Sequence, residues 1–161
     1  NIETTTSFVV NGKLHTGATG SAGEIGHLNI EQDGPLCNCG NRGCLEAYVG
    51  GPYLMKRVRK VRPNLLTPLD LARAAKAGDS TAKNIWRNVG RALGIAVGDL
   101  VYLLNPQLIV FTGGIAGAGD LILKPLRETL CHRAFKTPIQ AVRIQIATNA
   151  SQVGVIGASL L

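Results

Sequence analysis

Long apolar runs are absent from this chain of 161 residues, and both acidic and aromatic residues are scarce. Glycine, proline or a charged residue interrupts every apolar stretch before it reaches the length of a membrane span, so we expect no contact with a membrane. Apolar residues make up 45% of the chain and charged residues 17%, which indicates a globular rather than a disordered protein. This length suits one domain with a sizeable buried core.

The scarcity of acidic residues leaves a formal net charge of +7, which raises the question of nucleic acid binding. The densest basic stretch is KRVRKVRP, residues 56–63. It contains no interleaved aromatic residues and no groove-reading motif, and a solvated helix end explains it equally well, since cations there complement the helix dipole. A basic surface also suits an anionic small ligand such as a nucleotide.

The chain begins with Asn1, without an initiator methionine or a signal peptide, and we therefore expect it to be a fragment of a longer protein.

Turn and capping signals divide the first half of the chain. Asn11-Gly12 lies between two short apolar stretches and predicts a β-hairpin with a type I′ turn. The glycine-rich segment 15–23 predicts a loop, and residues 44–61 predict a mostly helical region with a glycine interruption. A second helical region is predicted to begin after Thr67, with Thr67 and Asp70 forming a capping box around Pro68.

A long amphipathic helix follows and ends at Asn105-Pro106. Its apolar face is predicted to contain Ala82, Ile85, Trp86, Val89, Leu93, Ala96, Val97, Leu100 and Leu104. Three glycines on this helix, Gly90, Gly94 and Gly98, recur at a spacing of four. This spacing indicates close packing against another backbone, although glycines without a special role are the alternative.

Strands and helices alternate in the rest of the chain. We predict a buried strand that ends in glycines at 107–114, a helix at 120–135, a strand at 142–148 and a closing helix at 151–161. In the second strand Val142, Ile144 and Ile146 lie on one side. This alternation indicates an α/β fold.

Cysteine is rare, yet three of the four cysteines lie within eight residues, in CNCGNRGC. An odd number argues against a closed set of disulfides, and Cys37 and Cys39 are too close in sequence for an easy mutual bridge. Glycines in the loop let three thiolates converge, and His27 offers a fourth ligand. The spacing therefore predicts a tetrahedral Cys₃His site that suits Zn²⁺, structural because all its ligands are protein side chains. Free buried thiols and a redox pair remain the alternatives, while Cys131 is interpreted as a small core residue.

The segments GEIGHLNI and GPLCNCGNRGCLEAY closely resemble the signature of the ROK family, which groups bacterial sugar kinases with related transcriptional repressors. AAKAGDSTA, LNPQLIVFTGGIAGAGDLILKPLRE and SQVGVIGASLL extend the resemblance over nearly the whole chain. The resemblance implies the actin-like, ribonuclease H-like sugar kinase fold. Residues 1–161 would be its C-terminal lobe, with an inserted zinc-binding loop and a zinc- and sugar-binding segment at 23–48, and the N-terminal lobe would be absent.

The resemblance also implies roles for individual residues. Glu24, His27 and Glu46 match the family's ligands for sugar hydroxyls, and carboxylates are suitable because a charged acceptor strengthens each hydrogen bond. From spacing alone, Glu24 and Glu46 would be ordinary surface carboxylates. The segment TGGIAGAG resembles a nucleotide-binding segment, in which Gly113 and Gly114 let the backbone approach ATP.

Two features of the family's kinases have no counterpart here. Neither the first phosphate-binding loop nor the aspartate that acts as general base is present, so we assign no catalytic residue and expect this chain alone to phosphorylate nothing. The segment Asn1–Ser7 contains no glycine where those kinases usually have a glycine-rich stretch. A non-kinase member, a degraded nucleotide contact or an artefact of the sequence would each explain this difference.

Three functions follow for the parent protein. The first is an ATP-dependent kinase of a hexose or an N-acylhexosamine, with Mg²⁺ accompanying ATP. The second is the sugar-sensing domain of a transcriptional repressor. Only in this second case would DNA be a partner. The third is a truncated, non-catalytic zinc-binding module. Reduced thiols and bacterial sugar metabolism indicate a cytoplasmic protein, and the resemblance together with the glycine-spaced helix predicts a homodimer.

Overall fold

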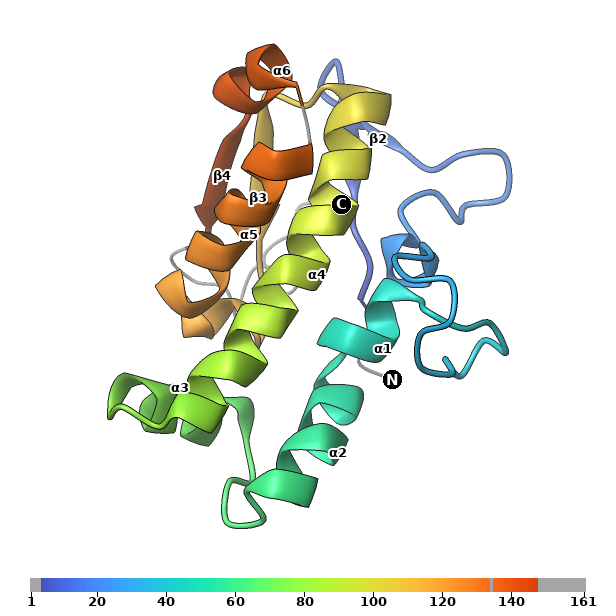
Figure 1. The fold of residues 1–161 in the computed structure, drawn as a ribbon. Helices are drawn as coiled ribbons and strands as arrows, with labels where there is room; N and C mark the ends of the chain where they lie inside the picture. Colours follow the sequence, from blue (N-terminus) through green and yellow to red (C-terminus); the bar gives the residue numbers. More distant parts are fainter. Residues whose placement is uncertain (1–3, 134, 148–161) are drawn as a thin grey trace.

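The computed structural model describes residues 4–133 and 135–147 (Figure 1). None of the described helices is both long and apolar enough to cross a membrane. The described elements, in chain order, are β1 (Phe8–Val10), β2 (Lys13–His15), η1 (Ile25–His27), α1 (Leu45–Val49), α2 (Gly51–Val61), α3 (Pro68–Lys76), α4 (Ser80–Leu104), β3 (Leu108–Phe111), η2 (Ala116–Ala118), α5 (Asp120–Arg133), α6 (Lys136–Ala141) and β4 (Arg143–Ile146).

Local sequence signals account for the boundaries of the first elements. β1 and β2 pair as an antiparallel hairpin, and the φ angles of Asn11 and Gly12 are 52° and 75°, as a type I′ turn requires. The glycine interruption between α1 and α2 is Gly50, whose ψ of 133° breaks the helix. Thr67 and Asp70 form the predicted capping box at the start of α3. These predictions are confirmed.

The long helix α4 lies at the centre of the core. Its predicted apolar face is buried, except that Ile85 is only partly buried and Leu104, the last helical residue, is half exposed. Asn105 ends the helix in the left-handed conformation with a φ of 43°. In Figure 1, α1, α3 and α5 are arranged around α4, and all of them contribute to one hydrophobic core.

The described residues of the second half form a β-α-β unit. β3 and β4 pair in parallel, and α5 and α6 connect them. The prediction that β3 is buried is wrong: Leu108 and Val110 are 43% and 47% exposed. Their neighbours Ile109 and Phe111 point to the other face and pack against the core, so the described elements cover one face of this strand only.

The structure differs from the sequence predictions at two points and leaves one untested. Cys131 is exposed on α5 rather than buried in the core, because the buried stripe of that helix is formed by Ile122, Leu123, Leu126 and Leu130. The short helix α6 was not predicted, because its six residues contain too few apolar positions to show a period. The closing helix predicted at 151–161 lies outside the described residues.

Two of the three spaced glycines let α4 and α5 approach each other closely. A Cβ atom on Gly94 would lie 2.7 Å from the carbonyl oxygen of Leu126 and from Cβ of Thr129. On Gly90 it would lie 2.6 Å from the carbonyl oxygen of Ile122. At Gly98, however, the nearest atom would be 3.7 Å away, which is ordinary van der Waals contact. Close packing is therefore confirmed for the first two glycines, and the third has no such role.

This difference predicts opposite effects for the same substitution at two positions of one helix. Gly94→Ala should lower the free energy of unfolding by about 1–3 kcal/mol, because the added methyl group overpacks the contact with α5. Gly98→Ala should leave it unchanged or raise it by up to about 1 kcal/mol, because alanine has the higher helix propensity. Urea unfolding of both variants measures the difference. Equal effects would contradict the assignment of Gly94 to the helix contact.

Candidate metal centre and neighbouring carboxylates

The segment between His27 and Leu45 folds back on itself through backbone hydrogen bonds. At its base, Leu45 donates to the carbonyl of Leu28, and Ile30 donates to the carbonyl of Gly43. At its tip, Cys37 donates to the carbonyl of Asn41, and Gly40 donates to the carbonyl of Cys37. These bonds form a narrow loop that brings both ends of the cysteine motif together. We call residues 35–44 the metal loop.

Gly43 explains why this loop needs glycine directly before its last cysteine. Its φ is +71°, and a Cβ atom there would overlap the carbonyl oxygen of Glu31. Any other residue would push the loop away from the segment that follows η1. The predicted tight turn is therefore a requirement of the backbone, and it places Cys44 at the start of α1.

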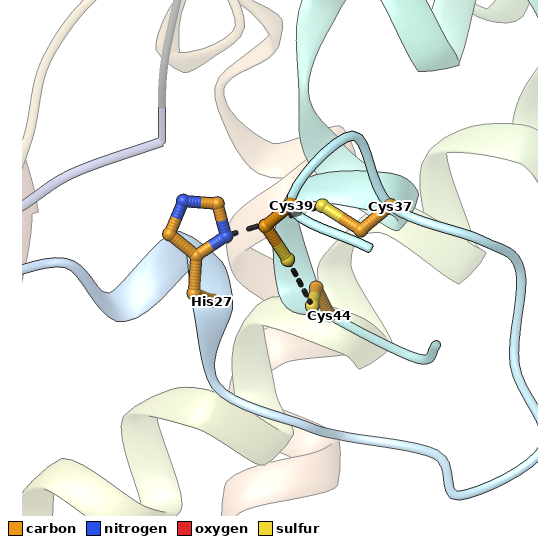
Figure 2. Close-up of side chains that lie close together, drawn as sticks. All are labelled: His27, Cys37, Cys39 and Cys44. Carbon is orange, nitrogen blue, oxygen red and sulfur yellow. Dashed lines mark hydrogen bonds between the residues drawn. The ribbon is translucent and has the colours of Figure 1, made fainter. Parts of the chain in front are cut away.

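The structure brings all four predicted ligands together. The donor atoms of His27, Cys37, Cys39 and Cys44 lie within 4.8 Å of one another. The sulfur atoms of Cys39 and Cys44 are 3.6 Å apart, and Nδ1 of His27 is 3.9 Å from the sulfur of Cys37 (Figure 2). All four cysteines of the chain are free, so no disulfide connects them. Ligands at tetrahedral angles around one zinc ion are about 3.8 Å apart, and these distances match that value.

Two thiols of the cluster have pKa values that are shifted in opposite directions. Burial, together with the neighbouring sulfur atoms of Cys39 and Cys37, raises the pKa of the Cys44 thiol to about 12. A backbone hydrogen bond at Asn41 lowers the pKa of Cys39, which is exposed. A bound dication reverses this balance, since its charge deprotonates a coordinating thiol outright.

Glu46 is the one buried charged residue of the described chain, with 8% of its surface exposed. It belongs to the first turn of α1, directly after the metal loop, and its Oε2 accepts a hydrogen bond of 2.6 Å from the backbone N–H of Thr4. A Cβ atom on Gly26 would lie 3.2 Å from the same oxygen. Glu46 therefore packs against the turn η1, whose last residue, His27, is exposed, as is Glu24 directly before the turn.

Gly113 and Gly114 lie in the loop between β3 and η2, at the carboxyl end of the strand. Both are exposed, and among the described residues no atom lies within 4 Å of a Cβ atom placed on either. The φ of Gly113 is +86°. We call residues 112–115 the glycine loop, whose backbone the described residues leave uncovered, and α5 begins at Asp120, shortly after it.

Two side chains that secure α1 were missed by sequence analysis. Arg57, in the basic stretch that we expected to be solvated, is partly buried and donates to the carbonyls of Ala47 and Tyr48 at the end of α1. Tyr48 donates its hydroxyl to Glu31. No sequence signal separates Arg57 from its basic neighbours. Arg62 is also engaged, since it pairs with Asp79 at 2.8 Å, whereas Lys56, Arg59 and Lys60 are exposed.

The Tyr48–Glu31 contact predicts a pH dependence of stability. Burial, followed by the hydrogen bond to Glu31, raises the pKa of Tyr48 to about 12. The pKa of an unfolded tyrosine is about 10, so this contribution to stability is present below pH 10 and is lost as the pH rises toward 12.

Denaturant unfolding between pH 9 and 11.5 measures this effect, and the unfolding free energy of the natural chain should fall more steeply than that of Tyr48→Phe. The absorbance difference at 295 nm between the two proteins should titrate above pH 11. Titration near pH 10 would contradict the contact between Tyr48 and Glu31.

Comparisons with known proteins show what the chain resembles. The glucokinase of Thermotoga maritima is 32% identical over 94% of this chain and 52% of its own length. The DNA-binding transcriptional dual regulator NagC of Escherichia coli is 35% identical over 86% of this chain and 37% of its own length. A crystal structure of a ROK family glucokinase from Streptomyces griseus, in complex with glucose and AMPPNP, matches with a TM-score of 0.80 at 26% identity, over 94% of this chain and 55% of that one.

The chain thus spans about half, or less, of the length of the curated relatives that it matches. The curated relatives that match include glucokinases, a transcriptional dual regulator and sugar repressors. The model of the ROK family matches residues 5–161, which include the metal loop, Glu46 and the glycine loop. The fold of this chain therefore matches about half of a ROK sugar kinase, and the chain belongs to the ROK family.

Proposed function

We propose that this chain is the sugar- and zinc-binding C-terminal lobe of an ATP-dependent kinase that phosphorylates a hexose or an N-acylhexosamine. One observation supports the proposal above the others: the buried carboxylate of Glu46 packs against the turn between Glu24 and His27, directly beside a cluster of four metal-ligating side chains. The glucokinase relatives supply the reaction type.

The proposed metal is a structural Zn²⁺ held by His27, Cys37, Cys39 and Cys44. Three thiolates and one imidazole form a donor set that zinc prefers, and four protein ligands leave no position for a reacting water. Nδ1 of His27 is the nitrogen nearest to Cys37, and Figure 2 shows the other ring nitrogen directed away from the sulfur atoms. Coordination through Nδ1 would leave Nε2–H to donate to a sugar oxygen.

The proposed sugar ligands are Glu24, His27 and Glu46. Thr4 donates to one oxygen of Glu46, which holds the carboxylate in place, and the carboxylate can still accept from a sugar hydroxyl. The exposed Glu24 would accept from another hydroxyl. Each charge-assisted hydrogen bond of this kind contributes about 1.5–3 kcal/mol.

The proposed nucleotide segment includes Gly113 and Gly114. Their exposed backbone, at the carboxyl end of β3, would approach the phosphates of ATP, and Mg²⁺ bound to ATP would neutralise charge on the phosphates. Because no catalytic base is assigned within residues 1–161, phosphoryl transfer is a property that we propose only for the intact protein.

The test is a coupled kinase assay on the full natural product of the gene that encodes this chain. We expect turnover that depends on ATP with at least one sugar among glucose, fructose, mannose and their N-acetylated amino derivatives. An inactive protein that nevertheless binds one of these sugars in calorimetry would contradict the kinase proposal and favour a sensor.

The alternative is the sugar-sensing domain of a ROK repressor. It is supported by the 35% identity to NagC and by the glycine-free segment Asn1–Ser7. A helix-turn-helix encoded upstream, together with sugar-dependent binding of the full protein to DNA, would support this alternative. In both cases we propose a cytoplasmic homodimer, and sedimentation measures the association.

A further inference from the structure

The hydroxyl group of Tyr53 lies beside the metal loop. Tyr53 is in the first turn of α2, and its half-buried ring packs against a small cluster formed by Cys37, Cys44 and Ala47. Its Oη accepts a hydrogen bond of 2.7 Å from the backbone N–H of Asn38. The same hydroxyl donates to the sulfur of Cys37 at 3.9 Å.

The direction of these two hydrogen bonds is fixed by chemistry. A backbone N–H can only donate, so the Tyr53 oxygen must be the acceptor toward Asn38. The phenolic proton is then available for the sulfur of Cys37, which as a metal-bound thiolate can only accept. The result is a short chain of hydrogen bonds that begins at the loop backbone and ends on a ligand atom, and each bond in such a chain polarises the next.

We propose that Tyr53 is a positioning residue for the metal centre, which holds the Cys37 thiolate and the loop tip through its hydroxyl group. This inference rests on the zinc site proposed above. Asn38 is the single residue between the ligands Cys37 and Cys39, so a hydrogen bond to its N–H restricts the separation of the two thiolates. Partners of this kind that surround the ligands tune metal affinity and orient the ligands.

Tyr53 also connects the metal loop to α2. Other contacts of the loop are internal, such as that from Cys37 to the carbonyl of Asn41, or come from the segment just before it, as from Asn29 to the carbonyl of Arg42. The phenol supplies a contact from an element outside the loop. Helix α2 therefore contacts the metal loop through Tyr53. It is also joined at Gly50 to α1, the helix that carries Glu46.

The test compares Tyr53→Phe with the matched control Tyr102→Phe. Tyr102 donates to the carbonyl of Arg133 at 2.6 Å and touches none of the four ligands. Phenylalanine keeps the ring and removes only the hydroxyl group. In competition with a chelator, we expect Tyr53→Phe to raise the Kd for Zn²⁺ about 10- to 100-fold, and the control to leave it unchanged.

Cobalt substitution distinguishes an effect on the sulfur from a general loosening of the loop. In the Co²⁺ protein, Tyr53→Phe should shift the sulfur-to-cobalt charge-transfer band, because the sulfur loses a proton donor. The control should not shift it. If the natural chain binds zinc but Tyr53→Phe changes neither the Kd nor the charge-transfer band, the proposed role of Tyr53 is wrong. The zinc proposal would then still stand. A natural chain that binds no zinc would instead overturn the zinc proposal.

A measurement on the natural chain alone covers the case in which Tyr53→Phe does not fold. Asn38 lies at an exposed loop tip, where amide hydrogen exchange is ordinarily fast. We expect the Asn38 amide of the zinc-loaded protein to be protected at least tenfold more than the exposed Cys39 amide, for which the described residues provide no hydrogen-bond acceptor. Equal exchange at both amides would contradict the hydrogen bond to Tyr53.

Discussion

Protein with the Cys44→Ser substitution should purify with less than about a tenth of an equivalent of zinc, against about one equivalent for the natural chain. Cys44 is completely buried, and its sulfur lies 3.6 Å from that of Cys39. A serine hydroxyl does not ionise near neutral pH and is a poor ligand for zinc, so three ligands remain. Plasma mass spectrometry of the purified protein measures the metal content.

Loss of the metal should also destabilise the fold. A ligand present at a hundred times its Kd stabilises the folded state by about 2.7 kcal/mol, and the variant should lose at least this amount in saturating zinc. Its melting temperature should no longer respond to a chelator, whereas that of the natural chain should fall.

Cys131→Ser is the matched control for this experiment. Cys131 is exposed on α5 and is not one of the four clustered ligands, so this variant should keep its zinc and its chelator response. Full zinc content in Cys44→Ser would contradict the assigned ligand set. Zinc loss in both variants would show that the effect is not specific to the cluster.

Glu46→Gln should weaken sugar binding by the full natural gene product about 10- to 100-fold, with little change in stability. The amide has the shape of the carboxylate, and its oxygen can still accept the hydrogen bond from Thr4. The negative charge is lost, however, and with it about 1.5–3 kcal/mol of a charge-assisted hydrogen bond to a sugar hydroxyl.

Calorimetric titration with the sugar that binds best measures this loss, and circular dichroism verifies the fold. Glu128→Gln provides the control, because Glu128 is exposed on α5 and has no recorded partner within the described chain. Equal affinities of Glu46→Gln and the natural protein would remove Glu46 from the proposed sugar site.

Local features of the fold could be predicted from the sequence because their causes lie within a few residues. The capping box at Thr67, the turn at Asn11 and the break at Gly50 each depend on the conformational preference of a short segment. The clustering of four possible metal ligands was predictable for the same reason, since all four lie between His27 and Cys44 and the glycines of that segment indicate its turns.

Features that depend on distant neighbours could not be predicted. The apolar sequence of β3 predicts a buried strand. Whether Leu108 and Val110 are covered, however, depends on other elements of the fold. Arg57 and Tyr53 look like ordinary helix residues, and their roles follow from where the end of α1 and the metal loop lie in space. The residue types alone show no difference between Arg57, which is partly buried, and its exposed neighbour Lys56.

The close contact between α4 and α5 has a mechanical consequence. α1, which carries Glu46, packs on α4, and α5, which follows the glycine loop, is docked to the same helix at Gly90 and Gly94 with almost no free space. The distance between Glu46 and the glycine loop is thus fixed by packing of α1 and α5 on the single helix α4, and no hinge lies between them in the described part of the chain. Occupancy of either segment should leave that separation unchanged, so any closing motion of the intact protein must bend the chain elsewhere.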